Sequence, residues 1–248
     1  MTILRRRADH PSFSLVDPNW KDETVVLIAG GPSVTVEQVG LAERAHAAGR
    51  VRCIVINDAY LLAPWADLLY AADAHWWRWH QDGLEKKSLG LTAAQVAERF
   101  AAFQGERCAI SNSVNKVKMP PGVHVIANAG GNVHGDGLSL KAYEIFTGRH
   151  SGFQALNIAV LAGAKTVLLL GYDGRAAKDG RTHWFGEHPR PTPPAIFGEI
   201  KKSFAAVEKL LRQAGVTVVN CSPGSSIDSF TKMDLEAALK FDYAAAAG

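Results

Sequence analysis

The sequence predicts an α/β fold of the Rossmann-like kind: a mostly parallel sheet with helices on both faces, a small helical insertion and a lid loop. Three apolar runs, residues 25–28, 51–56 and 65–72, are separated by short segments with helical spacing. This alternation is typical of βαβ units, whose parallel strands are buried on both faces. Polar residues or glycines end each run, and ligands bind at that edge of an open parallel sheet.

Length and composition favour one domain with additions. The chain has 248 residues, of which 47% are hydrophobic and 21% charged, as expected for a globular protein with a substantial core. We expect an irregular N-terminal arm over residues 1–22, a single Rossmann-like domain over 23–240 and a flexible tail over 241–248. Within the domain, we expect a Trp-rich helical insertion over 75–110 and a lid loop over 174–195.

Charge and cysteine content set broad limits on location and partners. The formal net charge is +3 and the basic residues are scattered, so a nucleic-acid partner is neither required nor excluded. Cys53, Cys108 and Cys221 are an odd, widely spaced set, which favours reduced thiols in a cytoplasmic protein. No stretch is as long and apolar as a membrane span. Assembly into a homo-oligomer is left open.

The first glycine turn follows residues 25–28 and reads Gly30-Gly31-Pro32-Ser33. A strand that runs into a glycine turn and a helix start can present backbone N–H groups and the positive helix end to an anion. The alternative is a tight βα turn alone, in which Pro32 takes the first helical position and Ser33 lies near the cap. The turn by itself does not decide between a nucleotide site and a structural turn.

Other strand ends add polar residues to the same rim. A second unit runs from a predicted helix over 153–162 to a strand over 167–170, and Ser151-Gly152 opens that helix on the side facing the rim. The remaining strand-end residues that we predict to contact a nucleotide are Asn57, Asp58, Asp73, Tyr172 and Asp173. The three aspartates could instead converge on a Mg²⁺ ion, hydrogen-bond a ribose, or cap neighbouring helices.

Two histidines are candidates for a general base. His183 and His188 lie five residues apart in the expected lid loop, and an imidazole has an ordinary pKa of about 6.5, close to working pH. At most one of them need act, and either could instead contact Glu187 or loop carbonyls. His150, just before the 153–162 helix, could contact a phosphate or serve as a neighbour of the helix cap.

Four motifs together resemble a known family. AGGPS after the first strand, IVINDA after the second, HSGFQALNIAVLAGAKTVLLLGYD and VVNCSPGSSIDSF are similar to those of a broad Rossmann-like family. That family includes bacterial lipo-oligosaccharide sialyltransferases, motility-associated flagellin glycosyltransferases and archaeal 6-hydroxymethylpterin pyrophosphokinases. The chain looks most like short members from phage and prophage genomes, and the similarity spans most of residues 24–230.

The resemblance implies roles for particular residues. In the sialyltransferases, the glycine turn and the residue ending the second strand contact the nucleotide, the Ser-Gly pair lies near its phosphate or ribose, and a lid histidine is the base. Carried over, this nominates Gly30, Gly31, Pro32, Ser33, Asn57, Ser151 and Gly152, with His183 or His188 as base. The chain departs from the sialyltransferases in the first turn, because it has Ala29-Gly30-Gly31 where those enzymes carry an Asn.

The first functional hypothesis is therefore a nucleotide-dependent transferase: a metal-independent, sialyltransferase-like glycosyltransferase that uses a nucleotide-sugar, with a CMP-sugar as first candidate. Its acceptor would be a glycan, or DNA in a phage setting. One alternative is a Mg²⁺-dependent pyrophosphokinase-like enzyme, and another is a non-catalytic nucleotide-binding or phage assembly protein. The chain lacks a Walker lysine motif and a dinucleotide glycine fingerprint, which disfavours P-loop hydrolysis and NAD chemistry.

Overall fold

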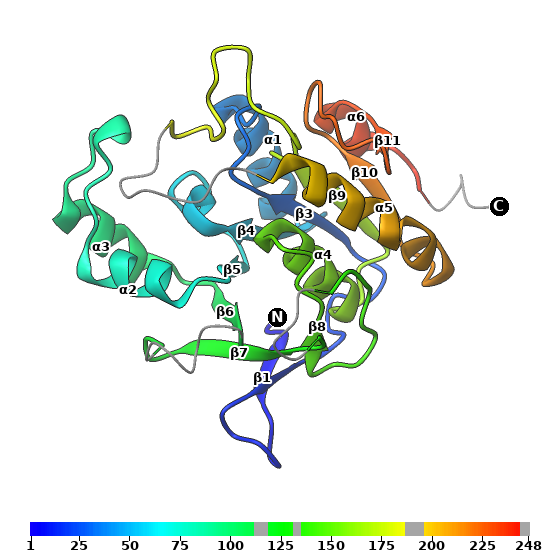
Figure 1. The fold of residues 1–248 in the computed structure, drawn as a ribbon, viewed down its shortest axis with the longest axis horizontal. Coiled ribbons are helices and arrows are strands. Elements are labelled where there is room, and N and C mark those ends of the chain that lie inside the picture. Colours follow the sequence, from blue (N-terminus) through cyan, green and yellow to red (C-terminus); the bar gives the residue numbers. More distant parts are fainter. Residues whose placement is uncertain (112–118, 131–134, 187–195, 244–248) are drawn as a thin grey trace.

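The computed structural model describes residues 1–111, 119–130, 135–186 and 196–243. In this part of the chain, nine parallel strands form one sheet in the order β11-β10-β9-β3-β4-β5-β6-β7-β8 (Figure 1). The strands are β3 (Thr24–Ile28), β4 (Arg52–Ile56), β5 (Leu68–Tyr70), β6 (Glu106–Ile110), β7 (Val123–Asn128), β8 (Glu144–Ile145), β9 (Thr166–Leu170), β10 (Thr217–Asn220) and β11 (Thr231–Lys232). The α/β fold expected from the sequence is confirmed.

The strand order reverses at the centre of the sheet. The chain adds β4 to β8 on one side of β3, then returns to place β9, β10 and β11 on the other side. β3 and β9 are paired in parallel, from Thr24 opposite Thr166 to Ile28 opposite Leu170. The carboxyl ends of these two strands therefore form a topological switch point, where open α/β sheets bind their ligands.

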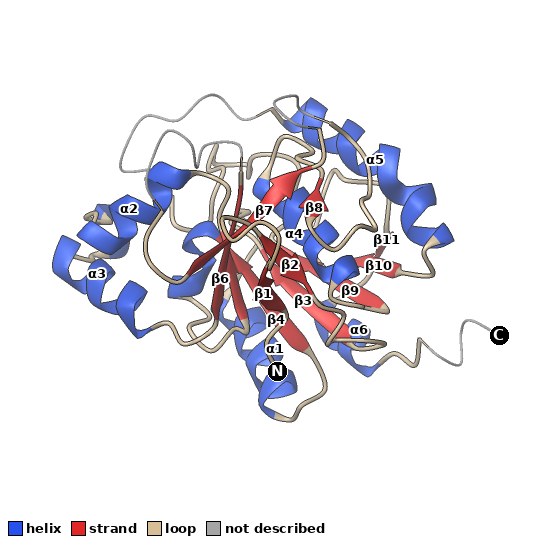
Figure 2. Ribbon diagram, turned by 90° about the horizontal axis from the view of Figure 1, so that it is seen from below, coloured by secondary structure: helices blue, strands red, loops and turns tan. Residues whose placement is uncertain are grey.

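Helices cover both faces of the sheet. They are α1 (Val36–Ala47), α2 (Ala74–Asp82), α3 (Ala93–Ala102), α4 (Ser151–Leu161), α5 (Phe197–Gln213) and α6 (Leu235–Lys240), with short 3-10 helices η1 (Asn57–Leu61) and η2 (Lys87–Leu89). In Figure 2, α4 and α5 lie above the sheet, and α1 and α6 lie below it.

Alternating side chains on each strand build a separate core on each face. On β3, Val25 and Leu27 pack in the core beneath α4 and α5, whereas Val26 and Ile28 pack in the core with α1 and α6. This is the period of two expected when successive side chains of a strand point to opposite faces. Nearly continuous apolar runs are required because both faces are covered.

The N-terminal region differs from the irregular arm expected over residues 1–22. It contains an antiparallel hairpin of β1 (Leu4–Arg6) and β2 (Ser14–Val16), and Trp20 is fully buried beside it. The Glu106 carboxylate accepts hydrogen bonds from the backbone N–H groups of Ile3 and Leu4 at 2.7 and 2.8 Å. Three-residue strands are too short to show a period, so only these long-range contacts reveal the hairpin.

The boundary expected for the Trp-rich insertion, residues 75–110, is also wrong. α2 and α3 form the crossover from β5 to β6, and residues 106–110 are β6 itself, inside the main sheet. Trp76 and Trp77 are buried in the core on the α1 face. The segment therefore belongs to the regular βαβ architecture.

Other expected regions fall partly outside the described residues. Of the lid loop over 174–195, residues 174–186 are described and are irregular, while 187–195 lie outside the described part, as do residues 244–248 of the expected tail. Among the described residues, no helix combines the length and apolar character that crossing a membrane requires.

Candidate functional site

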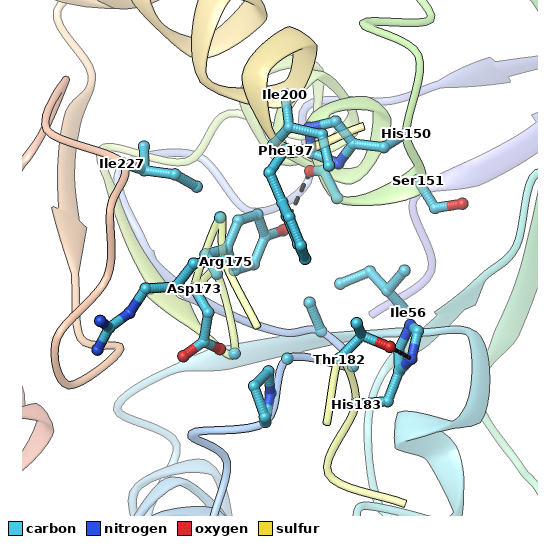
Figure 3. Close-up of a pocket in the computed structure, with 18 of the residues that line it drawn as sticks. Ile56, His150, Ser151, Asp173, Arg175, Thr182, His183, Phe197, Ile200 and Ile227 are labelled. Carbon is cyan, nitrogen blue, oxygen red and sulfur yellow. Dashed lines mark hydrogen bonds between the residues drawn. The ribbon is translucent and has the colours of Figure 1, made fainter. Parts of the chain in front are cut away.

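A cavity of about 180 Å³ lies at the carboxyl ends of β3, β4 and β9, beside the switch point (Figure 3). Its wall includes residues from the first glycine turn, the end of β4, the start of α4, the end of β9 and the loop after β9. The predicted residues that line it are Gly30, Gly31, Pro32, Asn57, Ser151, Gly152, Tyr172, Asp173 and His183. Segments far apart in sequence are thus brought to one cavity, while their contact with a nucleotide remains a prediction.

Gly31 is required by a close approach of two backbones. Its N–H donates to the carbonyl of Gly171 at 3.1 Å, which ties the turn after β3 to the end of β9. A Cβ at this position would collide with the Gly171 carbonyl and with the carboxylate of Asp173. The absence of a Cβ therefore lets the Gly171 carbonyl and the Asp173 carboxylate pack directly against the turn.

Asn57 begins η1 with a left-handed backbone, φ +53°, immediately after β4. Asn adopts this conformation more readily than most residues with a side chain. The turn places Asn57 on the cavity wall, whereas the next residue, Asp58, points away from it into the protein.

Asp173 is a buried carboxylate on the cavity wall. Its exposed fraction is 6%, and its Oδ2 accepts hydrogen bonds from Ser33 Oγ at 3.0 Å and from Ser33 N at 3.4 Å. Burial raises the pKa of Asp173, while the hydrogen bonds from Ser33 oppose that rise. Ser33, predicted to contact the nucleotide, does not itself line the cavity and instead holds Asp173.

A buried polar network fixes the end of β9. Ser225 Oγ donates to the carbonyl of Tyr172 at 2.6 Å and accepts from Asn220 Nδ2 at 2.9 Å. Ser222 Oγ accepts from the Tyr172 N–H at 2.7 Å, and the Tyr172 hydroxyl donates to the carbonyl of Gly152 at 3.0 Å. β9, the turn after β10 and the start of α4 are therefore held together beneath the cavity.

His150 caps α4 and also lines the cavity. Its Nδ1 accepts the N–H of Phe153 at 3.3 Å, so the neutral ring carries its proton on Nε2. Burial lowers the pKa of His150 to about 3, because the ring packs against aromatic neighbours such as Phe204, at 5.0 Å between centroids. His150 is therefore a neutral side chain at physiological pH and is unsuited to act as an acid.

His183 lies on the cavity wall opposite the Asp173 side (Figure 3). Its Nδ1 is 2.9 Å from Thr182 Oγ1, and its ring stacks on Phe185 with centroids 4.9 Å apart. The N–H of Trp184 donates to the carbonyl of Gly30 at 3.1 Å, which anchors this loop on the glycine turn. His188, the other predicted base, lies outside the described residues.

Asp58 and Asp73 do not line the cavity, contrary to the prediction that they contact a nucleotide. Asp58 is buried and accepts hydrogen bonds from Trp76 Nε1 at 2.9 Å and from Lys86 Nζ at 2.5 Å. Its Oδ1 also lies 2.9 Å from His80 Nε2. Asp73 caps α2 by accepting the N–H of His75 at 2.8 Å. Both carboxylates stabilise the fold.

The hypothesis that three aspartates converge on one Mg²⁺ ion is therefore wrong. Asp58, Asp73 and Asp173 have separate partners, and the described residues contain no group of three acidic, His or Cys side chains placed to hold a metal ion. Strand-end position alone could not show this, because side chains of adjacent residues can point in opposite directions from one turn.

Several wall residues were not predicted. Arg175 follows Asp173 by two residues and adds a positive charge to the cavity. Its place directly after the predicted β9 strand could have identified it from the sequence. Phe197 and Ile200 come from the first turns of α5, and together with Ile227 they form an apolar part of the cavity wall. Their spacing is that of any amphipathic helix, so only tertiary packing identifies them as wall residues.

Comparison with known proteins adds no assignment: no protein-family model matches the chain, and no curated protein is significantly similar to it. The resemblance drawn from the sequence motifs therefore remains a prediction.

Proposed function

We propose that this protein is a nucleotide-dependent transferase, and that it transfers a sugar from a nucleotide-activated donor. The observation that carries the proposal is the convergence of the glycine turn, Asn57, the start of α4, the Tyr172-Asp173 pair and His183 on one cavity at the switch point. Ligand sites of open parallel sheets occupy this position.

The electrostatics of the cavity favour an anionic group at the α4 end. The first turn of an 11-residue helix directs N–H groups and the positive end of its dipole outward at Ser151 and Gly152. Arg175 lies on the opposite side of the cavity, where its positive charge partly offsets the negative charge of Asp173 (Figure 3). A phosphate of the donor is expected near Ser151, away from the negative charge of Asp173.

Sugar transfer needs a base but few other protein groups. In the proposed step, an acceptor hydroxyl oxygen forms a bond to the anomeric carbon while the bond from that carbon to the nucleotide phosphate oxygen breaks. The leaving nucleotide takes the bonding electrons, and the acceptor proton passes to His183. When His183 Nδ1–H donates to Thr182 Oγ1, the basic lone pair of the ring is on Nε2.

Nucleotide binding is tested by thermal unfolding in the presence of CMP, UDP, GDP, ATP and CMP-sialic acid, each with and without Mg²⁺. A ligand at 100 times its dissociation constant adds about 2.7 kcal/mol to the free energy of unfolding. Stabilisation by a cytidine nucleotide without Mg²⁺ supports the proposal. Stabilisation only by ATP with Mg²⁺ favours pyrophosphoryl transfer instead, and no shift with any nucleotide rejects the proposal.

The role of His183 is tested by His183→Ala in a transfer assay with the donor that stabilises the protein. We expect turnover to fall about 10²- to 10⁴-fold with nearly unchanged donor affinity, because only the proton acceptor is lost. His10→Ala, at an exposed site in the N-terminal hairpin, is the control and should keep full turnover. If His188→Ala alone abolishes turnover, the base is His188.

A further inference from the structure

The protein buries two carboxylates at the strand-end edge of the sheet, Asp58 after β4 and Asp173 after β9, and their surroundings differ. Asp58 is 2% exposed and lies within 2.9 Å of both His80 Nε2 and Trp76 Nε1, with Lys86 Nζ at 2.5 Å. Asp173 is 6% exposed, and among the described residues no Lys, Arg or His lies within 4.0 Å of its carboxylate, although the charge of Arg175 acts on it from farther away. Buried carboxylates are usually paired, because the loss of hydration is otherwise uncompensated.

The two hydrogen bonds that Asp173 accepts from Ser33 both end on Oδ2. Ser33 does not line the cavity, so these hydrogen bonds hold the carboxylate on the side away from the cavity. Gly31 packs against the same oxygen, because its lack of a Cβ lets Oδ2 approach its backbone closely. Ser33 and the charge of Arg175 compensate the carboxylate in part, and it is a held acceptor to which a donor group in the cavity would add.

We propose that Asp173 accepts hydrogen bonds from the vicinal hydroxyls of a ribose, so that the cavity selects ribonucleotides over 2′-deoxyribonucleotides. This inference rests on the proposed function. A carboxylate only accepts hydrogen bonds and repels phosphate, so its partner must be a donor group without negative charge. A ribose diol offers two hydroxyl donors, and the two lone pairs of Oδ1 can accept both while Ser33 holds Oδ2.

The position of Asp173 agrees with the covalent order of a nucleotide. Asp173 and Ser151 lie on opposite sides of the cavity (Figure 3). The ribose of a nucleotide is bonded directly to the 5′-phosphate, so a phosphate near Ser151 places the sugar in the cavity between that helix end and Asp173. The base then extends beyond the ribose, away from the phosphate.

Ser33 is a positioning residue in this arrangement. It does not touch the ligand, but its hydroxyl and N–H hold Oδ2 and thereby set the direction of the carboxylate. Ser33→Ala removes the hydroxyl and leaves the charge, so it should weaken the preference for ribose by a smaller factor than loss of the carboxylate.

The experiment measures dissociation constants by calorimetry for CMP, UMP, AMP and GMP and for the 2′-deoxy form of each. For the nucleotide that binds the wild type most tightly, we expect the ribo form to bind about 10- to 100-fold more tightly than the 2′-deoxy form, the range for one hydrogen bond to a charged group. In Asp173→Asn, that ratio should fall to within about 3-fold of unity. A merely structural role of Asp173 would weaken both forms equally and leave the ratio unchanged.

Asp179→Asn is the matched control. Asp179 lies in the same loop after β9, is exposed and pairs with Arg181 at 2.7 Å outside the cavity wall, so its replacement should leave the ratio unaltered. Equal affinity of the wild type for both sugar forms overturns the ribose assignment while nucleotide binding itself stands. This comparison needs no variant and therefore holds even if Asp173→Asn fails to fold.

Two other outcomes also overturn the assignment. If Asp173→Asn changes the preference for CMP over UMP while the ribo-to-deoxy ratio stays, the carboxylate contacts the amino group of the base. If it removes only a dependence of affinity on Mg²⁺, the carboxylate is a metal ligand. Failure of the wild type to bind any nucleotide rejects the proposed function itself.

Discussion

At the scale of single residues, Asp58 shows how a buried charge can be purely structural. Its carboxylate joins the end of β4 to α2 through Trp76 and to the segment after α2 through Lys86. Burial alone would raise the pKa of Asp58, but the adjacent His80 and Lys86 outweigh burial and hold it well below its ordinary value. Each charge in this cluster therefore depends on the others for compensation.

Replacing Asp58 tests that dependence. Asp58→Ala leaves Lys86 buried without its counter-charge, and we expect the free energy of unfolding to fall by about 3–5 kcal/mol. Urea denaturation measures the change. Asp9→Ala, which breaks the exposed contact with Arg7, is the control and should leave the denaturation midpoint nearly unchanged. A loss below about 1 kcal/mol for Asp58→Ala would contradict the structural role.

At the scale of elements, the β1–β2 hairpin is attached to the sheet at several points, of which the Glu106 carboxylate holds two backbone N–H groups. Glu106 on β6 accepts the N–H groups of Ile3 and Leu4 with separate oxygens, while Trp20 fills the core beneath. The hairpin therefore covers the apolar surface at one side of the α4 face.

Glu106→Gln should loosen this attachment. The amide keeps one acceptor oxygen and turns an NH₂ group toward the second N–H, which leaves one buried donor unpaired at a cost of about 1–3 kcal/mol. We expect faster hydrogen exchange at Ile3 and Leu4, measured by NMR, with unchanged protection at Leu27 in the central strand. Unaltered exchange at both amides would show that the hairpin's other hydrogen bonds and its packing hold it without Glu106.

At the scale of the whole molecule, His150 links folding to pH. The folded state keeps the pKa of His150 at about 3, while the unfolded chain takes up the proton near the ordinary pKa of about 6.5. The unfolded state therefore binds more protons between these values. The stability from His150 is complete above pH 6.5 and is lost as pH falls toward 3.

His150→Asn should flatten this part of the pH profile. Asn can still cap α4, but it does not titrate, so the slope of unfolding free energy against pH should decrease by up to about 1.4 kcal/mol per pH unit between pH 6 and 4. Urea denaturation at several pH values measures the slope. His10→Asn is the exposed control, and a slope equally steep in wild type and His150→Asn would refute the linkage.

Sequence reasoning worked best where local pattern and burial agree. β3, β4 and β9 are apolar runs of five residues each, and a parallel strand covered on both faces must be such a run. β1 and β2, with three residues each, and β8 and β11, with two each, were missed because they are defined by their pairing rather than by their composition.

The sequence by itself determined the α/β class and the rim on which Gly31, Asn57 and Asp173 meet, because strand ends of a parallel sheet share one edge. Only the tertiary structure decided which partners each carboxylate at that rim has, and whether it faces the cavity. Asp58 is paired with Lys86, 28 residues away, and Asp173 with Ser33, 140 residues away. The pKa of a buried carboxylate depends on partners that folding brings from distant parts of the chain, so the neighbouring sequence cannot predict it.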